Sequence, residues 1–304
     1  MKPLSLTLHT HLMIAVALVA LSGCASSVPE PKDFVDNQTT VLSRGIEMPV
    51  TLVYPKTRSK PSPLVLLVHG HGGTRDEAGA FVRVAEQLAR VGIASIRMDF
   101  AGCGDSTESF QKNNLTTMRL DIRAAKAFAL RTIAVDRKRI AMVGFSMGGR
   151  LAALESTRAD YRAMVLWAPA LDDGADDLKD MFGGEAAYRA MRSIAEKQGY
   201  TDFTTSWGQA QQLGLQWFSD MESSRPMDAI ADYRGRLTLI HGSADDVVLP
   251  EVSARAAAAA DNVRDLQHIV IDGADHGFGL FNDRPEFARQ LVHETVTYLE
   301  SALR

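Results

Sequence analysis

Residues 139–154 read RIAMVGFSMGGRLAAL: a short apolar run, a serine flanked by glycines, and the start of a helix-like run. Glycine stands two positions before and two positions after Ser146, where a side chain would collide with the neighbouring strand and helix in a sharp turn. Such a turn exposes the serine hydroxyl and puts the N–H of Met147 at a helix N-terminus, where partial positive charge favours an oxyanion. The pattern therefore favours a nucleophilic serine, and an ordinary serine in a glycine-rich turn stays the alternative.

Outward from this turn, apolar runs alternate with runs of helical spacing. Strict alternation of strand and helix predicts an α/β fold with a mostly parallel sheet that is covered by helices on both faces. Strands are predicted at 41–42, 50–54, 64–68, 93–98, 139–143, 163–167, 237–240 and 268–271, and helices within 81–91, over 116–132, after Ser146, over about 251–260 and from Pro285 onward.

The alternation stops between 171 and about 233. Some sixty residues are too many for a plain connection, so we expect an inserted cap that is partly helical, with a helix near 185–197. Its aromatic residues Trp207, Trp217 and Phe218 are more typical of a cap core than of substrate contacts.

The first two dozen residues have the pattern of an export signal. Lys2 precedes an apolar run over 12–21, which is too short to span a bilayer, and Ser22-Gly23-Cys24 follows. This ending resembles a bacterial lipobox, which implies removal of residues 1–23 and a lipid on Cys24. Residues 24–37 are then a tether and 38–304 the domain. The alternatives are a secreted protein with a chance cysteine and a retained membrane helix.

Composition and charge exclude further classes of function. The net charge is −4 with no block of basic residues, so a nucleic-acid surface has no support. No metal-ligand cluster or nucleotide fingerprint is visible, and no cofactor is expected. Cys103 would be the one thiol left in the domain, which excludes an internal disulfide. We expect it to be passive, and a reactive thiol would need electropositive surroundings.

A nucleophilic serine needs a base and an orienting carboxylate. His276 follows the last predicted strand, at the sheet edge where sites form in open α/β folds, and is the preferred base. Asp245 follows strand 237–240 and is the preferred carboxylate. Asp246, Asp275 and Asp99 are the weaker candidates, and His69, His241, His268 and His293 are expected to be structural.

In the order Ser146, Asp245, His276, these residues resemble the catalytic residues of α/β-hydrolase-fold serine hydrolases. The motifs HGHGG at 69–73, DFAGCGDS at 99–106, GFSMGG at 144–149, HGSAD at 241–245 and DHG at 275–277 bring the chain nearest to small carboxylesterases of the cinnamoyl (feruloyl) esterase and monoacylglycerol lipase kind.

This resemblance implies hydrolysis of a small-molecule ester, with the backbone N–H of His71 as a second oxyanion donor beside that of Met147. A peptidase or amidase on the same fold is the alternative, for which the acidic run over 172–180 could hold a free N-terminus. A non-catalytic lipoprotein is the alternative of another class. Alanine at 25 implies, by the lipoprotein sorting rule, a place in the cell envelope at the outer membrane if the host has one.

Overall fold

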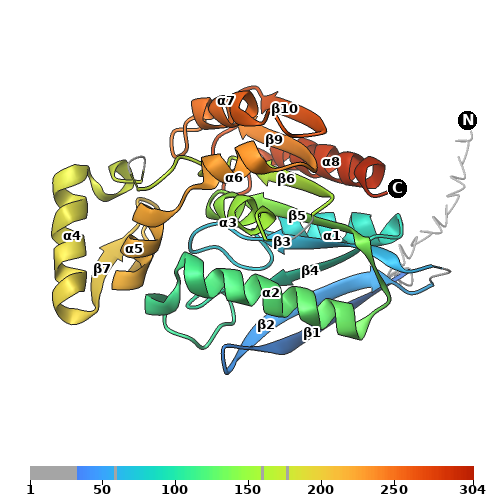
Figure 1. Ribbon diagram of the computed structural model, residues 1–304, viewed down its shortest axis with the longest axis horizontal. Coiled ribbons are helices and arrows are strands. Elements are labelled where there is room, and N and C mark those ends of the chain that lie inside the picture. Colours follow the sequence, from blue (N-terminus) through green and yellow to red (C-terminus); the bar gives the residue numbers. More distant parts are fainter. Residues whose placement is uncertain (1–32, 58–59, 159–160, 176–177) are drawn as a thin grey trace, which may run out of the picture. The chain divides into compact units, whose positions relative to one another are not determined.

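A computed structural model describes residues 33–304 except 58–59, 159–160 and 176–177, and its centre is an eight-stranded sheet (Figure 1). The strand order is β1-β2-β4-β3-β5-β6-β9-β10; β2 pairs antiparallel with β1 and β4, and the other pairs are parallel. The predicted mostly parallel α/β sheet is confirmed. The strands are β1 (Phe34–Ser43), β2 (Ile46–Pro55), β3 (Ser62–Val68), β4 (Ala94–Met98), β5 (Val135–Phe145), β6 (Ala163–Trp167), β9 (Arg236–Gly242) and β10 (Asp265–Ile271).

Helices cover both faces of this sheet because its central strands are apolar on both sides. In β3, Leu64 and Leu66 belong to the apolar core shared with α2, α3, α6 and α7, and Val65 and Leu67 to the core shared with α1 and α8. The covering helices are α1 (Ala80–Arg90), α2 (Leu115–Thr132), α3 (Met147–Ser156), α6 (Pro226–Asp232), α7 (Pro250–Ala259) and α8 (Pro285–Ala302).

The inserted cap lies between β6 and β9 and combines helices with a hairpin that the sequence did not predict. It contains the 3₁₀ turn η2 (Asp180–Phe182), α4 (Glu185–Gln198), β7 (Tyr200–Thr204), β8 (Ala210–Gly214) and α5 (Leu215–Ser223). Helix α6 packs on α3 and α7, so it belongs to the layer over the sheet. The cap therefore ends before Pro226, earlier than the predicted boundary near 233.

The aromatic residues of the cap are of two kinds, buried and exposed. Trp217 and Phe218 are fully buried and pack edge-on, with ring centroids 5.1 Å apart, beside Phe182. They form the cap core, as expected. Trp207 is different, since 52% of its surface is exposed at the β7–β8 turn.

The start of the domain is earlier than predicted. Strand β1 begins at Phe34 and pairs with β2 from its first residue, so residues 34–37 are part of the sheet rather than of a tether. Their sequence is polar because one face of this strand is exposed, and for that reason this part of the strand was not predicted. The predicted signal over 1–23, Cys24 and the rest of the tether lie outside the described residues. Within the described ranges, no helix is long and apolar enough to cross a membrane.

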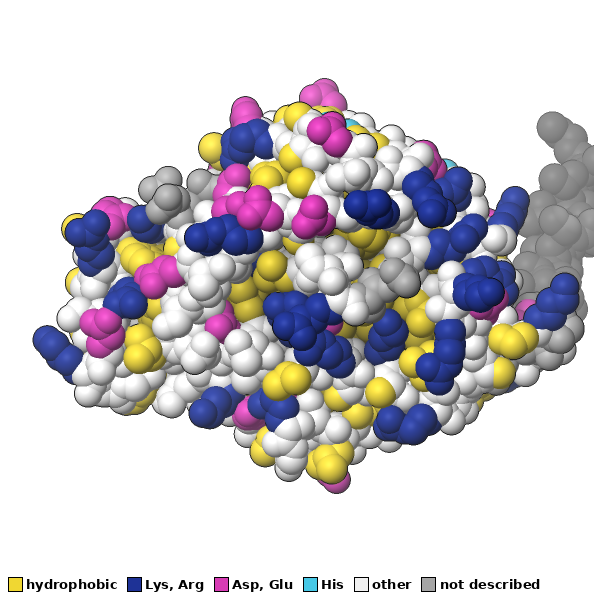
Figure 2. All heavy atoms as spheres, in the orientation of Figure 1, with side chains coloured by type: hydrophobic (Ala, Val, Ile, Leu, Met, Phe, Trp, Pro, Cys, Tyr) yellow, Lys and Arg dark blue, Asp and Glu magenta, His cyan; other side chains and the backbone are white. Residues whose placement is uncertain are grey.

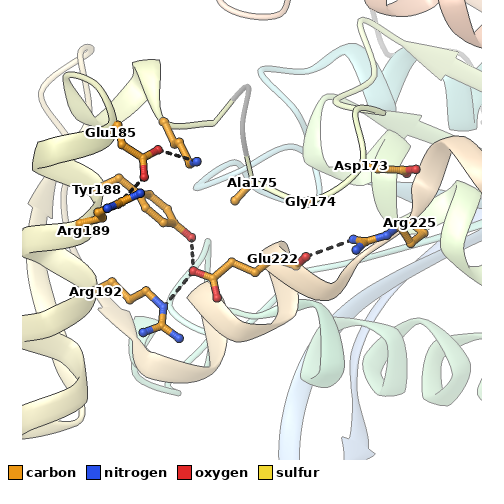
Figure 3. Close-up of a pocket in the computed structure, with 10 residues that line it drawn as sticks. Asp173, Gly174, Ala175, Glu185, Tyr188, Arg189, Arg192, Glu222 and Arg225 are labelled. Atoms are coloured by element: carbon orange, nitrogen blue, oxygen red, sulfur yellow. Dashed lines mark hydrogen bonds and ion pairs between the residues drawn. The ribbon is translucent and has the colours of Figure 1, made fainter.

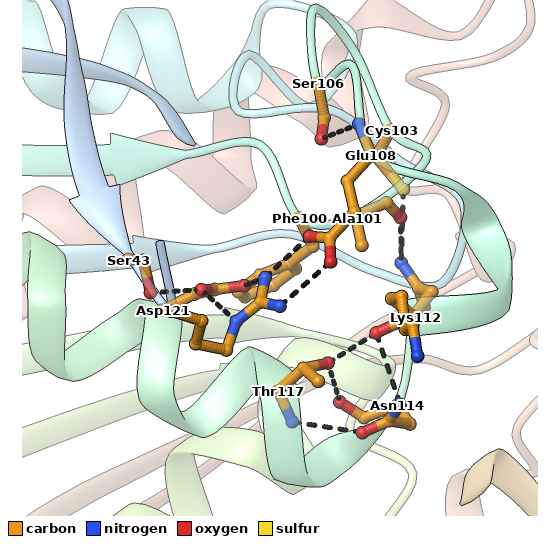
Figure 4. Close-up of polar contacts among 12 residues, drawn as sticks. Ser43, Phe100, Ala101, Cys103, Ser106, Glu108, Lys112, Asn114, Thr117 and Asp121 are labelled. Carbon is orange, nitrogen blue, oxygen red and sulfur yellow. Dashed lines mark hydrogen bonds and ion pairs between the residues drawn. The ribbon is translucent and has the colours of Figure 1, made fainter. Parts of the chain in front are cut away.

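The turn between β1 and β2 is fastened to α2 by polar contacts (Figure 4). Ser43 donates a hydrogen bond to Asp121 over 2.5 Å, and the Arg44 guanidinium bridges Asp121 at 2.9 Å and Glu108 at 2.7 Å. Glu108 belongs to the segment that follows the 99–106 loop, so these contacts hold that segment against the domain.

On the face shown in Figure 2, acidic side chains lie among basic ones.

Candidate active site

The turn that joins β5 to α3 holds Ser146 in a strained conformation, with φ of 51° and ψ of −114°. Its backbone N–H donates to the Trp167 carbonyl over 2.9 Å, which fastens the turn to β6. A Cβ at Gly144 would lie 2.3 Å from the Gly148 carbonyl oxygen, and a Cβ at Gly148 would lie 2.0 Å from the Val68 carbonyl oxygen. The two glycines are therefore required by close backbone approach.

The three residues expected to act together lie together at the carboxyl edge of the sheet. His276, in the loop after β10, has Nε2 3.1 Å from the Ser146 hydroxyl oxygen. Its Nδ1 lies 2.7 Å from Oδ2 of Asp245, in the loop after β9. Because Nδ1 donates to a carboxylate, Nε2 is the ring nitrogen left to accept the serine proton.

The Asp245 carboxylate is buried and saturated with hydrogen bonds. Its Oδ1 accepts from the N–H groups of Val247 and Val248, each at 2.9 Å, and its Oδ2 accepts from His241 Nε2 at 3.0 Å as well as from His276. Burial by itself raises the pKa of this carboxyl, but the bonds to the two histidines outweigh it and hold the pKa well below its usual range. Asp245 is thus ionised and fixed in orientation.

Two backbone N–H groups are free, that of Met147 directly after Ser146 and that of His71, whose neighbour Gly70 packs on Phe145 so closely that a Cβ there would lie 2.9 Å from the Phe145 ring. In the part of the chain that the structure describes, neither the His71 N–H nor the Met147 N–H donates to a protein acceptor. Met147 is the first residue of α3, where the helix leaves its N–H groups unpaired. The loop with His71 closes through a bond from Gly73 N–H to the Gly70 carbonyl at 3.1 Å, and Glu77 accepts from Gly70 N–H at 2.9 Å.

A scan against family models matches residues 65–290 to the alpha/beta hydrolase family. The chain belongs to this family. An uncharacterized protein of Mycobacterium tuberculosis is 25% identical over 223 residues, which are 73% of this chain and 66%, just under two thirds, of that protein. Family membership supports hydrolase activity.

Two solved structures show the same fold as this chain. The ferulic acid complex of Est1E from Butyrivibrio proteoclasticus has a TM-score of 0.66 at 21% identity, covering 87% of this chain and 98% of that one. The monoacylglycerol lipase of Paleococcus ferrophilus has a TM-score of 0.63 at 19% identity, covering 84% and 100%. At these identities the likeness shows the fold alone.

His241 contacts the Asp245 carboxylate, which the sequence did not indicate. It is fully buried, and its Nε2 lies 2.8 Å from the Val248 carbonyl as well as near Asp245, so Nε2 carries the proton. Its Nδ1 then accepts from the Ser253 hydroxyl at 2.5 Å. The prediction of a structural role missed its bond to Asp245, and the only signal was that His241, near the end of β9, stands four residues before Asp245 in the following loop.

The other candidate residues serve the loops around the site. His69 Nδ1 donates to the Gly70 carbonyl at 2.7 Å, and burial lowers the pKa of this ring to about 4, so it is neutral and structural. Asp99 accepts from the N–H groups of Arg75 at 2.7 Å and Asp105 at 3.0 Å. Asp275 accepts from Gly279 N–H at 2.9 Å. Both aspartates build turns, as expected.

Cys103 has the surroundings of a passive side chain. It is buried, and its sulfur accepts from the Asn113 amide at 3.4 Å. Burial raises the pKa of its thiol to about 12, so the reactive thiolate is scarce at neutral pH. In the described ranges, no group of three or more His, Cys, Asp or Glu side chains is placed to hold a metal ion.

A cavity of about 590 Å³ lies apart from this cluster, in the cap between α4 and α5 (Figure 3). The charged groups that line it already have partners. Glu222 accepts from Tyr188 at 3.0 Å and from Arg192 at 2.8 Å, and Lys179 pairs with Glu185 at 2.5 Å. Ser146, His276 and Asp245 are not among its lining residues. We assign no ligand to it.

Proposed function

We propose that this hydrolase cleaves carboxylic esters through an acyl-enzyme on Ser146. The observation that carries the proposal is the continuous hydrogen-bonded chain from the Ser146 hydroxyl through His276 to Asp245, at 3.1 and 2.7 Å, beside two unpaired N–H groups. A serine, an imidazole and a buried carboxylate in this order are what nucleophilic acyl transfer requires.

The geometry supports the following sequence of steps. His276 takes the serine proton through Nε2 while Oγ attacks the ester carbonyl carbon, and Asp245 stabilises the imidazolium. The His71 and Met147 N–H groups donate to the oxyanion of the tetrahedral intermediate. His276 then protonates the departing alcohol oxygen. Water attacks the acyl-enzyme with His276 again as base, which releases the acid and restores Ser146.

A small-molecule ester is the substrate class that the similar structures favour. The Est1E structure is described with bound ferulic acid, and another similar structure is a monoacylglycerol lipase. The test is a panel of p-nitrophenyl esters of increasing acyl length together with methyl ferulate. We expect the wild type to hydrolyse part of the panel, Ser146→Ala to lose at least about 10⁴-fold in kcat, and Ser156→Ala, on the same helix, to keep full activity.

A peptidase on the same fold is the second candidate, because one oxygen of the acidic run lacks a partner. Oδ1 of Asp172 pairs with Arg255 at 2.6 Å, but Oδ2 is buried without a hydrogen bond among the described residues. Asp173 accepts from Met227 N–H at 2.9 Å. Aminoacyl p-nitroanilides run beside the ester panel separate the two, and faster turnover of the anilides would favour the peptidase.

The proposal also places this hydrolase in the cell envelope, with a lipid on Cys24. Its support is the apolar run over 12–21 and the lipobox-like Leu21-Ser22-Gly23-Cys24. A non-catalytic lipoprotein that binds a partner is the alternative of another class. An inert ester panel together with no reaction of Ser146 with a fluorophosphonate would favour that alternative.

A further inference from the structure

The cap hairpin reaches the loop that carries His71 through two glutamine side chains. Oε1 of Gln211, on β8, lies 2.7 Å from Nε2 of His71. The Gln209 amide nitrogen donates to the Gly72 carbonyl over 3.2 Å, and the Gln211 amide nitrogen donates to Gln209 Oε1 over 3.1 Å. These bonds close a ring that runs from the Gly72 backbone through both glutamines to the His71 side chain.

The direction of every bond in this ring is determined by the one group that cannot donate. The Gly72 carbonyl only accepts, so the amide nitrogen of Gln209 faces it and its oxygen faces Gln211. The Gln211 oxygen then faces His71, whose Nε2 carries the proton. Trp207 Nε1 also donates to the Gln209 oxygen, at 3.4 Å, which agrees with this orientation.

The His71 ring is fixed and neutral in this arrangement. Phe110 and Trp217 pack edge-on against it, with ring centroids 5.5 and 6.3 Å away. Its Nδ1 is buried and has no hydrogen-bond partner among the described residues, so protonation would bury an unpaired N–H. Burial accordingly lowers the pKa of His71 by more than the bond to Gln211 raises it.

We propose that Gln211 and Gln209 are positioning residues that hold the loop at His71, through the His71 side chain and the Gly72 carbonyl, so that the His71 N–H stays aimed at the oxyanion. Residues 70, 72 and 73 are glycines, which leave the backbone free to adopt many directions. The loop's own bonds hold Gly70, and the two glutamines hold the His71 side chain and Gly72. A donor stabilises an oxyanion only where it is held in place before the reaction. The cap thereby acts on the chemical step. This inference rests on the proposed ester hydrolysis.

The test compares Gln211→Ala with Gln212→Ala on the best ester of the panel. Gln212 is the neighbouring residue of β8, and it bonds Gln111 at 2.9 Å and Asp202 at 3.0 Å, away from the ring. We expect Gln211→Ala to lose about 10–50-fold in kcat with KM within about twofold, less than the 10²–10³-fold typical of removing an oxyanion donor. Gln212→Ala should keep wild-type kcat.

A tetrahedral mimic and a conservative variant supply readouts that loss of packing would not change. An aryl boronic acid forms a tetrahedral adduct on serine, so its affinity for Gln211→Ala should fall by the same factor as kcat/KM. Gln211→Glu keeps an oxygen acceptor for His71 and should retain more of kcat than the alanine variant. If Gln211→Ala does not fold, Gln209→Ala, at a partly exposed position, removes the contact with Gly72 and is measured in the same way.

The possible failures are distinguishable. Equal kcat values for Gln211→Ala and Gln212→Ala, or a loss confined to KM, would overturn the positioning role and leave the ester hydrolase proposal intact. Absence of hydrolysis by the wild type, or full activity of Ser146→Ala, would instead overturn the proposed function itself.

Discussion

Among single residues, His241 tests how far the orientation of Asp245 matters. A hydrogen bond to a charged group contributes about 1.5–3 kcal/mol, and each 1.4 kcal/mol corresponds to a tenfold change in rate. We therefore expect His241→Leu to lower kcat for ester hydrolysis by about 10–100-fold. His241→Gln keeps an N–H donor for Asp245 and should lose clearly less. Equal losses for the two variants would show that the hydrogen bond from residue 241 is not the cause.

Glu77 gives a prediction about stability. Burial raises the pKa of its carboxyl from 4.5 to about 7, and the bond from Gly70 N–H lowers it by less. Because the folded state holds this proton more tightly than the unfolded state, the free energy of unfolding decreases as the pH rises from about 4.5 to about 7. Glu77→Gln keeps an acceptor for the Gly70 N–H and removes the loss of stability that ionisation of Glu77 causes.

We expect Glu77→Gln to be more stable than the wild type at pH 8 by up to about 3 kcal/mol, at about 1.4 kcal/mol for each tenfold change in proton affinity. Near pH 4 the two should be alike. Urea unfolding at both pH values measures this difference, with Glu294→Gln on α8 as a control that should follow the wild type. An unchanged pH dependence in Glu77→Gln would contradict the assignment.

At the scale of elements, Arg150 fastens the cap to helix α3. Its guanidinium is buried and donates to the carbonyls of Ala170 at 2.9 Å and Asp172 at 2.7 Å, and to the hydroxyl of Ser224 at 2.5 Å. Burial lowers its pKa to about 10, so it is still charged at neutral pH.

Arg150→Met would leave these acceptors buried and unpaired, and each unpaired acceptor lowers the free energy of unfolding by about 1–3 kcal/mol. We expect a loss of at least about 3 kcal/mol in stability and faster proteolysis within the cap, measured by thermal unfolding and limited trypsin digestion. Arg158→Met, at an exposed position near the end of the same helix, should behave as the wild type. Equal behaviour of the two variants would mean that Arg150 does not fasten the cap.

The sequence predicted those elements whose apolar pattern is local. The strands β3 and β6 are continuous apolar runs and match the prediction, as does the apolar half of β5. The polar start of β5, residues 135–138, was not predicted. The segments of β1 and β8 are polar, because one face of β1 is exposed and β8 carries Gln211 and Gln212 toward other side chains. Apart from residues 41–42, neither strand has a pattern that would distinguish it from a loop.

The residues of the site also fall into those that chain order predicts and those that it does not. Ser146, His276 and Asp245 each follow a strand at the carboxyl edge, so chain order and topology bring them together. The contact of Gln211 with His71 joins residues 140 positions apart and depends on how the cap folds. The bond between His241 and Asp245 depends on the shape of one loop. No local pattern predicts either contact.

For the whole molecule, the lipid anchor is a separate prediction. If Cys24 is acylated, the wild type should sediment with membranes and incorporate an alkynyl fatty acid, and Cys24→Ser should do neither. Cys103→Ser is the matched control and should keep both properties, because Cys103 is buried in the domain. Labelling of Cys24→Ser, or an unlabelled wild type, would contradict the anchor.

The proposed acyl-enzyme is tested most directly by the site at which the intact protein is modified. The wild type treated with a fluorophosphonate should gain one adduct, and peptide mass spectrometry should place it on Ser146. His276→Ala should react slowly, by about 10³-fold or more, because the serine then lacks its base. An adduct on another residue, or undiminished ester hydrolysis after Ser146 is blocked, would contradict the mechanism.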